Sequence, residues 1–272
     1  MDASTQSAFR PDLLEGKVAF LSGGTSGINL GIAKRFASLG AKVAVLGRNP
    51  EKAAAAAKEI EAEIPGARAL ALTADVRDYA AVETALATAA NELGKLDILI
   101  AGQAGNFPAL ALGMSANAFK AVIDIDLIGS FNLFRAGHQH LNLPGASLIA
   151  ITAGQAVRPM ALQSHVCAAK AGVNMLVKTL AIEWGPLGVR VNGISPGPIE
   201  GTEGMRRLAP TPESEARVRA AAPLQRFGTV DEIGDAAVYL CSPAGAYVSG
   251  TILDVDGGTG AGSSAAIVGG LV

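Results

Sequence analysis

Residues 17–39 read KVAFLSGGTSGINLGIAKRFASL, and this stretch decides the fold. A short apolar run over 17–22 leads into a glycine-rich turn, and the turn leads into a run whose apolar residues have helical spacing over 28–39. Strand, tight turn and helix in this order form the first half of a βαβ unit, whose turn lies at the carboxyl end of a parallel strand. The stretch therefore predicts a parallel sheet with a ligand site above this turn.

The same alternation of strand and helix continues along the rest of the chain. Six further, mostly apolar runs have the length of strands, and they cover 41–47, 68–73, 96–101, 146–152, 189–195 and 251–255. Their apolar character is typical of strands buried on both faces, and right-handed crossovers place helices on both sides of such a sheet. We therefore expect an α/β fold, a Rossmann-like doubly wound parallel sheet of seven strands with helices on both faces, in one domain over residues 1–272.

Start and stop signals predict the helices between these strands. They cover 28–39, a second helix from Asn49 or Pro50, a third from Asp78 to about Gly94, a long fourth over 115–140, a fifth over 163–184 and a shorter one from Thr229. Two stretches break the rhythm. Residues 196–223, rich in Pro, Gly and Arg, are expected to form a long loop that serves as a substrate lid. Residues 257–272, rich in Gly, Ser and Ala, are expected to form a C-terminal tail or an interface arm.

Composition excludes several classes of protein. Half of the 272 residues are apolar and 17% are charged, so the chain can bury a large core and is not disordered. A net charge of -2, with no basic run beyond Arg206-Arg207, argues against nucleic acid as a partner. We find no secretory signal and no apolar stretch near the roughly 20 residues of a membrane span. Cys167 and Cys241 stand far apart without a Cys/His cluster, which predicts no metal site and suits a reducing compartment.

Residues 22–29, which we call the phosphate cradle, are suited to holding a pyrophosphate. Backbone N–H groups of a glycine-rich turn and the positive end of the following helix attract phosphate oxygens. Gly23 allows the tight turn, Gly27 lets a ligand approach the backbone, and Ser26 can donate its hydroxyl. Thr25 and Ile28 complete the predicted cofactor-binding set in this turn. The alternative is that the glycines only close a tight connection.

The end of the second strand predicts which nicotinamide cofactor is bound. An NAD-specific site offers a carboxylate to the ribose 2′-hydroxyl there, whereas this chain has Arg48 followed by Asn49. A guanidinium suits a 2′-phosphate by charge and by bidentate geometry, so we expect NADP(H) rather than NAD(H). Asp75 and Val76, after the third strand, are expected to contact the adenine. The alternatives are a solvated arginine and an ordinary surface turn.

Several further features resemble one family in their order along the chain. Ala104-Gly105 follows the fourth strand, Lys170 lies on the helix after the fifth, and 196–199 reads Pro-Gly-Pro-Ile after the sixth. The last strand closes with Asp-Val-Asp-Gly-Gly at 254–258. In this order the chain resembles the short-chain dehydrogenases/reductases over nearly its full length. The resemblance implies that the cofactor also meets Lys170, Pro196, Gly197 and Ile199.

The catalytic positions depart from the usual pattern of that family, which is Asn, Ser, Tyr and Lys with the tyrosine four residues before the lysine. Lys170 remains, but Val166 stands at the tyrosine position. Ala153 stands at the serine position and Asp126 at the asparagine position. Without the phenol and the hydroxyl, nothing is positioned to exchange the proton of a carbonyl oxygen. The pattern therefore argues against ordinary interconversion of ketones and alcohols.

Four segments resemble one branch of the family, the peroxisomal-type 2,4-dienoyl-CoA reductases. They are Gly-Asn-Phe at 105–107, the run over 117–126, Gln-Ser-His at 163–165, and the run over 201–208. The resemblance implies NADPH-dependent reduction of 2,4-dienoyl-CoA thioesters to 3-enoyl-CoA, with chemistry that runs through an aspartate and a lysine. In this sequence those catalytic residues are Asp126 and Lys170.

The chemistry of these two residues suits such a reaction. Hydride addition to the conjugated chain pushes negative charge onto the thioester oxygen, so the site needs hydrogen-bond donors there and, later, a proton at carbon. We expect Asp126 and Lys170 to hold a water that protonates the carbon, and Lys170 also to hold the nicotinamide ribose. The alternative for Asp126 is a buried carboxylate that Lys170 neutralises for structure alone.

Five further residues are expected to bind the acyl-CoA substrate. Asn106 and His165 can donate to the thioester oxygen, and Phe107 can line the acyl pocket. Arg206 and Arg207 lie in the expected lid and suit the phosphates of CoA. The alternatives are a structural histidine and solvated lid charges.

Two places near the cofactor depart from the family pattern. Asn29 stands third in the phosphate cradle in place of glycine, where its amide is expected to crowd the pyrophosphate and to lower cofactor affinity. After the fourth strand the family has one or two asparagines, but 101–105 here reads Ala-Gly-Gln-Ala-Gly. Gln103 either replaces a lost polar contact or blocks the site.

The sequence leaves three functions open. The first is a dienoyl- or enoyl-CoA reductase, the second a reductase of another conjugated or carbonyl substrate, and the third an inactive NADP-binding sensor or assembly protein. The helices over 115–140 and 163–184 resemble those that pair subunits in this family, which implies a homo-oligomer, usually a tetramer. Residues 269–272 lack a peroxisomal signal, so we expect a cytoplasmic location.

Overall fold

Seven parallel strands form one sheet in the order β3-β2-β1-β4-β5-β6-β7 in the computed structural model, which describes residues 8–262. The strands are β1 Val18–Ser22, β2 Lys42–Gly47, β3 Ala69–Thr73, β4 Ile98–Ala101, β5 Ser147–Ile151, β6 Arg190–Pro196 and β7 Ile252–Val255. Each strand lies within two residues of its expected bounds. The fold class predicted from the sequence is therefore confirmed.

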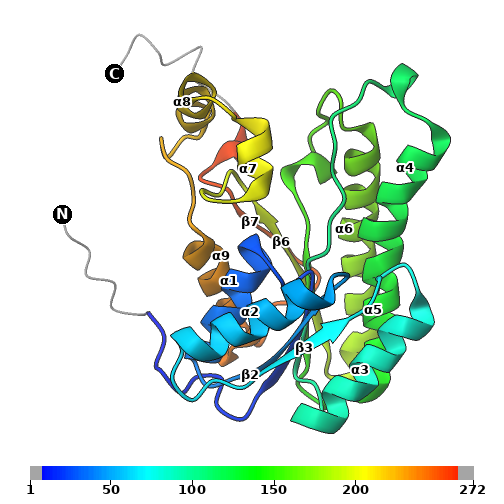
Figure 1. Cartoon of the computed structure of the whole chain (residues 1–272), viewed down its shortest axis with the longest axis vertical. Helices are drawn as coiled ribbons and strands as arrows, with labels where there is room; N and C mark the ends of the chain where they lie inside the picture. The colour runs from blue at the N-terminus through cyan, green and yellow to red at the C-terminus, as the bar shows by residue number, and fades with distance from the viewer. Residues whose placement is uncertain (1–7, 263–272) are drawn as a thin grey trace.

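Helices cover both faces of this sheet (Figure 1). They are α1 Gly27–Ser38, α2 Pro50–Glu63, α3 Tyr79–Leu93, α4 Ala116–Ile123, α5 Gly129–Gly137, α6 Ser164–Trp184, α7 Glu203–Leu208, α8 Pro212–Ala221 and α9 Val230–Cys241. Helices α3, α5 and α6 lie on one face, and α1, α2 and α9 lie on the other. The expected caps Asn49, Asp78 and Thr229 each accept a backbone N–H at the start of their helix.

Each face of the sheet buries its own apolar core. Phe20 of β1 packs with side chains from α3, α5 and α6, whereas Leu21, the next residue, packs with side chains from α1, α2 and α9. Successive residues of a strand point to opposite faces, and both side chains are fully buried because helices cover both faces. In such a sheet, ligands bind beyond the carboxyl ends of the strands.

The helix expected over 115–140 is interrupted in its middle. Helices α4 and α5 are joined by a π-helical turn, η2 (Asp124–Ile128), and a 3₁₀ turn, η3 (His138–His140), follows α5. The expected helix is therefore confirmed over 116–140, but its π and 3₁₀ turns were not predicted. A π turn adds a residue to the helix and changes the direction of its side chains. This turn carries Asp126.

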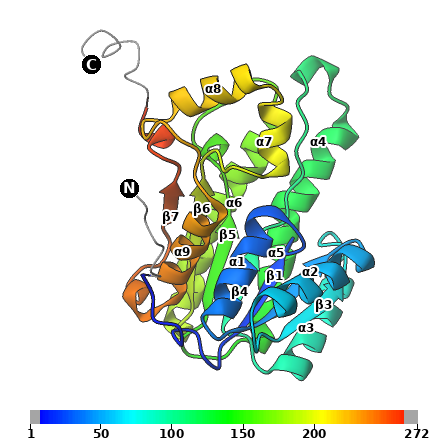
Figure 2. The ribbon, with the colours of Figure 1, turned by 60° about the vertical axis from the view of Figure 1, so that its left-hand side comes forward.

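The segment 196–223 is not the long loop that its composition suggests. It contains α7 and α8, which begin after the threonine caps Thr202 and Thr211. No residue of α8 is buried, so α8 contributes little to the core. Figure 2 shows α7 and α8 at the end of the sheet toward which the β7 arrow points.

The beginning of the expected C-terminal tail packs against this helical segment. The Leu224 N–H donates to the Gly257 carbonyl oxygen at 3.1 Å, and Gly258 lies against Pro223. A 3₁₀ turn, η7, follows at Thr259–Ala261. The remainder of the tail lies outside the described residues.

Candidate active site

The phosphate cradle leads from β1 into α1 and leaves the first N–H groups of the helix without a side-chain cap. Ser26 is the N-cap of α1, and its side chain makes no capping hydrogen bond. Gly27 has a φ of +55°, and a Cβ there would meet nothing within 4 Å. Gly23 has a φ of +69°, and a Cβ there would lie 2.9 Å from the main-chain nitrogen of Gln103. The turn therefore requires glycine and presents an open helix N-terminus, while Ile28 packs partly against the core.

The end of β2 offers an unpaired guanidinium to a ligand in this cradle. The Thr25 side chain packs against Gly47, the last residue of β2. Arg48 is exposed and makes no ion pair with any of residues 8–262. The Asn49 side chain is not free in this way, because it accepts the Lys52 N–H at 2.8 Å and caps α2.

The two side chains expected at the adenine are already engaged. Arg77 Nε lies 2.9 Å from Asp75 Oδ1, and Arg77 Nη2 lies 2.5 Å from Asp75 Oδ2. These hydrogen bonds lower the pKa of Asp75 to about 2, although partial burial opposes the shift. Val76 is buried against Gly129, and its carbonyl oxygen accepts a hydrogen bond from Asn132. A ligand can therefore meet Val76 only through its main chain.

The remaining residues expected to meet the cofactor lie at the end of β6 and just after it. Pro196 ends the strand, and a Cβ on Gly197 would lie 2.6 Å from Asp256 Cα, so the close approach requires glycine. Ile199 is 2% exposed and packs in the core beside Gly228. The Ile199 side chain therefore belongs to the core, and only its main chain can face a ligand.

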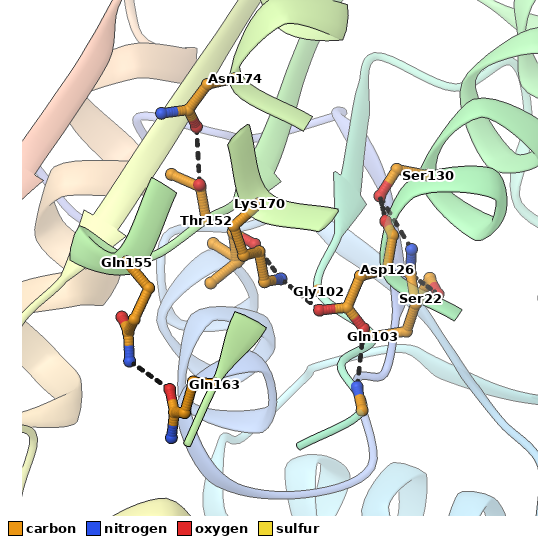
Figure 3. Close-up of polar contacts among 12 residues, drawn as sticks. Ser22, Gly102, Gln103, Asp126, Ser130, Thr152, Gln155, Gln163, Lys170 and Asn174 are labelled. Carbon is orange, nitrogen blue, oxygen red and sulfur yellow. Dashed lines mark hydrogen bonds and ion pairs between the residues drawn. The ribbon is translucent and has the colours of Figure 1, made fainter. Parts of the chain in front are cut away.

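Asp126 and Lys170 meet as a buried ion pair (Figure 3). Lys170 Nζ lies 3.3 Å from Asp126 Oδ2 and donates to the Ile151 carbonyl oxygen at 3.0 Å. The Gly105 N–H donates to Asp126 Oδ1 at 2.7 Å. Asp126 is fully buried, and the Lys170 side chain is 7% exposed. The π turn and α6 thus bring together the two residues expected to be catalytic.

A chain of buried hydrogen bonds joins the π turn to the end of β1 (Figure 3). Ser22 Oγ donates to Gln103 Oε1 at 2.7 Å, and Gln103 Nε2 donates to Ser130 Oγ at 3.0 Å. Ser130 Oγ in turn donates to the Asp126 carbonyl oxygen at 2.6 Å. Gln103 therefore supplies polar contacts that fix the turn. The sequence pattern did not single out Ser130, although a hydroxyl four residues after Asp126 is the spacing at which such a bond forms.

Asn29 lies within α1 with helical backbone. Its Nδ2 donates to the Gly102 carbonyl oxygen at 2.7 Å. A Cβ on Gly102 would overlap the Asn29 amide. The departures at Asn29 and at Gly102 are therefore linked, because the Asn29 side chain fills the space that a side chain at position 102 would take.

Apolar or small side chains occupy the positions of the family's phenol and hydroxyl. Val166 is 4% exposed and packs with Val122 and Ala169, and Phe107 lies at the edge of this cluster. Ala153 is the N-cap of a 3₁₀ turn, Gly154–Ala156. Neither Val166 nor Ala153 can transfer a proton.

The residues expected at the thioester differ in their exposure. Asn106 is exposed, whereas His165 is fully buried. The His165 ring stacks on Phe107 with centroids 4.3 Å apart, and neither of its nitrogens has a hydrogen-bond partner among the described residues. His165 therefore cannot donate to a substrate in this conformation.

Arg206 and Arg207 both pair with Glu203 on the exposed surface of α7. The hydrogen bonds from Arg207 and Arg206 lower the pKa of Glu203. No contact joins either arginine to Asp126 or Lys170 in the part of the chain that the structure describes. The two guanidiniums are therefore occupied, and a CoA phosphate would have to compete with Glu203 for them.

The residues at the carboxyl ends of β1 and β2 fit a dinucleotide phosphate cofactor. The uncapped start of α1 and its glycines suit a pyrophosphate, and Arg48 suits a further phosphate.

No helix among residues 8–262 combines the length and the apolarity that crossing a membrane requires.

Comparison with protein families gives a match over residues 23–260 to a family model described as "Enoyl-(Acyl carrier protein) reductase". The chain is 43% identical to a peroxisomal 2,4-dienoyl-CoA reductase [(3E)-enoyl-CoA-producing] of Saccharomyces cerevisiae, over 93% of this chain and 87% of the relative. It is 44% identical to the mouse (Mus musculus) protein of that description, over 92% and 86%. A Bacillus subtilis relative, named for a (2E)-enoyl-CoA product, is 38% identical over 90% and 97%.

Solved structures with similar folds include dehydrogenases. A Bacillus anthracis short-chain dehydrogenase has a TM-score of 0.81 and 37% identity, covering 90% of this chain and 97% of that one. A gluconate 5-dehydrogenase of Burkholderia cenocepacia, in complex with NADP and tartrate, has a TM-score of 0.86 and 30% identity, covering 93% and 98%.

Proposed function

The chain belongs to the short-chain dehydrogenase/reductase family of oxidoreductases, and on this basis we propose that it reduces conjugated 2,4-dienoyl-CoA thioesters with NADPH. The observation that carries the proposal is the buried pair of Asp126 and Lys170 in a site where Val166 replaces the family's phenol. The names of the similar proteins support the substrate class.

The proposed cofactor is NADPH, held along the carboxyl ends of the strands. The cradle from Gly23 to Ile28 would hold the pyrophosphate, and Arg48 the 2′-phosphate. When bound, the cofactor supplies the hydride that the reduction requires. The NADP in the similar gluconate 5-dehydrogenase structure supports this choice of cofactor.

The proposed proton source is a water held by Asp126 and Lys170. The Gly105 N–H fixes one oxygen of the Asp126 carboxylate, which leaves the other oxygen to the lysine and to a water. The ammonium group makes that water more acidic and offsets the negative charge that develops on the thioester oxygen. After hydride addition the water would give its proton to carbon, and the hydroxide left behind would be stabilised by the Lys170 ammonium group and reprotonated from solvent. No side chain then has to exchange a proton with an oxygen of the substrate.

The substrate contacts are also part of the proposal. Asn106 is exposed, follows Gly105 in the chain, and can donate to the thioester oxygen. His165 can do so only after its ring is uncovered. Arg206 and Arg207, on the proposed lid over 196–223, would meet CoA phosphates by leaving Glu203.

We further propose a homotetramer, because apolar side chains remain exposed on the helices that are expected to pair subunits. Ile128 and Phe131 are 42% and 43% exposed, and Met175 and Ile182 on α6 are 63% and 78% exposed. Exposed apolar side chains that gather on a protein surface are typical of subunit contacts. Light scattering of the purified protein tests the assembly.

The cytoplasmic location predicted from the sequence is retained as part of the proposal, although the named eukaryotic relatives are peroxisomal. Cell fractionation with an antibody to the chain tests this location.

The decisive test of the proposed function is a substrate panel. We expect NADPH oxidation with a 2,4-dienoyl-CoA, and no oxidation with a simple ketone or a saturated acyl-CoA. Product analysis by mass spectrometry and NMR separates a (3E)- from a (2E)-enoyl-CoA, the two products for which the relatives are named. NADPH binding without turnover of any acyl-CoA would contradict the proposal and favour a sensor, whereas turnover of a different conjugated or carbonyl compound alone would favour the broader reductase.

A further inference from the structure

His165 is the histidine of the described residues whose two ring nitrogens are both buried without a hydrogen-bond partner. Buried polar atoms in proteins nearly always have a hydrogen-bond partner. Both ring nitrogens of His165 lack a partner among the described residues, and both are closed off from solvent. Because a buried unpartnered polar group is unfavourable, the arrangement is typical of a binding group whose ligand is absent.

The Phe107 ring covers one face of the His165 ring. The two rings are stacked, with centroids 4.3 Å apart and an angle of 30° between their planes. Phe107 lies on the segment 102–110, which has no helix or strand. At its far end the Ala109 N–H donates to the Leu162 carbonyl oxygen at 2.9 Å. Leu162 has a φ of +68°, a conformation that a leucine rarely adopts, so the segment is held against a strained partner.

The same segment closes the ion pair. Gly105, two residues before Phe107, donates its N–H to Asp126. Asp126 is fully buried, and the Lys170 side chain is 7% exposed. An acyl group cannot reach the carboxylate or the imidazole in this conformation, so the segment must move before a substrate binds.

We propose that Phe107 closes the acyl site of the free protein by stacking on His165, and that the planar conjugated acyl group of a bound thioester takes the place of the phenyl ring. Both groups are flat and apolar with delocalised electrons, so the exchange preserves a stack on the imidazole. The inference has two parts: the closure, in which Phe107 covers His165 in the free protein, and the acyl half, in which an acyl group replaces Phe107. The acyl half rests on the proposed function, whereas the closure does not.

Histidine labelling with diethyl pyrocarbonate tests the closure without cofactor or turnover. The chain has three histidines, so peptide mass spectrometry can follow His165 separately. His138 and His140, each with a buried Nε2 that lacks a partner among the described residues, are internal references whose labelling should be the same in all variants. We expect His165 to react roughly tenfold faster in Phe107→Ala than in the unsubstituted protein, because the covering ring is lost. Phe107→Leu keeps an apolar cover and should react at an intermediate rate. Phe119→Ala, at a phenylalanine on the exposed side of α4, is the matched control and should change nothing.

Equal labelling of His165 in Phe107→Ala and in the unsubstituted protein, with both folded by circular dichroism, would overturn the closure. The acyl half is tested by adding ligand to Phe107→Ala. We expect 2,4-dienoyl-CoA to restore the protection of His165 roughly tenfold, and CoA alone to leave it unprotected. If calorimetry detects dienoyl-CoA binding but His165 stays reactive, the acyl half is wrong. If no dienoyl-CoA binds to either protein, the proposed function and the acyl half fail together, and the closure result still stands.

Discussion

The Asp126–Lys170 pair is costly to bury and cannot be kept with one member alone. Desolvation of two charges is offset here by their contact at 3.3 Å and by the hydrogen bonds from Gly105 and to Ile151. A merely structural role would be served as well by two apolar side chains. The retention of two charges in an apolar surrounding, next to Val166 and Ala169, is therefore an argument for chemistry.

The pair predicts a specific pattern of stability. Lys170→Met leaves the Asp126 carboxylate buried without its counter-charge, and we expect a loss of about 3–5 kcal/mol in the free energy of unfolding. The double variant Asp126→Leu/Lys170→Met removes both charges and should lose less than the single variant. Urea unfolding measures both values. A single variant as stable as the unsubstituted protein would show that the contact with Lys170 does not offset the burial of Asp126.

The exchange between Asn29 and Gly102 predicts a compensating pair of substitutions. Gly102→Ala places a Cβ on the Asn29 amide, and we expect a loss of about 1–3 kcal/mol from this overlap. Asn29→Gly alone loses the hydrogen bond to Gly102 and adds a glycine to α1, at a cost of about 1 kcal/mol. In the double variant the overlap is gone, so its loss should be smaller than the sum of the two. Additive losses by thermal unfolding would mean that the two residues do not share this space.

Arg48 predicts the choice between cofactors. Its guanidinium is exposed and unpaired within residues 8–262, so Arg48→Ala should weaken NADPH binding roughly 10- to 100-fold and leave NADH binding unchanged. Fluorescence titration of the two reduced cofactors measures this. Arg68→Ala, at an arginine paired with Glu92 before β3, is the control. Equal weakening of NADPH and NADH by Arg48→Ala would contradict a contact with the 2′-phosphate.

At the scale of elements, the π turn decides where Asp126 points. The extra residue of η2 turns the Asp126 carboxylate toward Lys170 on α6, and the hydrogen bond from Ser130 holds its carbonyl oxygen. Gln103 anchors this turn to the end of β1, where the cofactor is expected. In a regular α-helix the side chains of these residues would point in different directions around the helix axis. The π turn is therefore part of the site.

Helix α9 carries a cap whose strength depends on pH. The Arg226 side chain, together with the Thr229 N–H, lowers the pKa of Glu232 to about 2 from an ordinary value of 4.5, against an opposing effect of burial. Because the folded pKa lies below the unfolded one, this stabilisation is present above pH 4.5 and is lost as the pH falls toward 2. Glu232→Gln should therefore have a lower Tm than the unsubstituted protein at pH 7. The loss in the free energy of unfolding should be less than about 1 kcal/mol, because the pair is partly exposed.

The difference in Tm between Glu232→Gln and the unsubstituted protein should shrink as the pH approaches 2. Thr229→Ala, which removes the uncharged half of the same capping box, should cost about 1 kcal/mol at every pH in this range. A Glu232→Gln difference that stays constant from pH 7 to pH 2 would rule out the ionised cap.

At the scale of the whole molecule, strands and helix caps could be predicted from sequence, because each depends on residues that are close together in the chain. Strands buried on both faces are continuous apolar runs, and caps such as Asp78 act on their own helix, so both appeared in the pattern. The meeting of Asp126 with Lys170 was expected only from the resemblance to the 2,4-dienoyl-CoA reductases, and the structure brings the two side chains to 3.3 Å.

Features that depend on contacts between distant segments could not be predicted. The spacing of apolar residues over 115–140 is nearly the same with and without one π turn, so the sequence did not indicate η2. The proline-rich start of α8 suggested a loop, although proline is favoured in a first helical turn. The cover that Phe107 places on His165 joins two segments far apart in the chain, and only the folded structure brings them together.

The central claim is that Asp126, with Lys170, supplies through water the proton that a phenol gives in other members of the family. The most direct test is the turnover of 2,4-dienoyl-CoA by Asp126→Asn, compared with Asp124→Asn, whose aspartate lies on the same π turn but pairs with Lys120 near the surface. We predict that Asp126→Asn lowers kcat by roughly 10²- to 10⁴-fold while NADPH binding is kept, and that Asp124→Asn is close to normal. A folded Asp126→Asn protein that binds NADPH and reduces the dienoyl-CoA at the normal rate would contradict the claim.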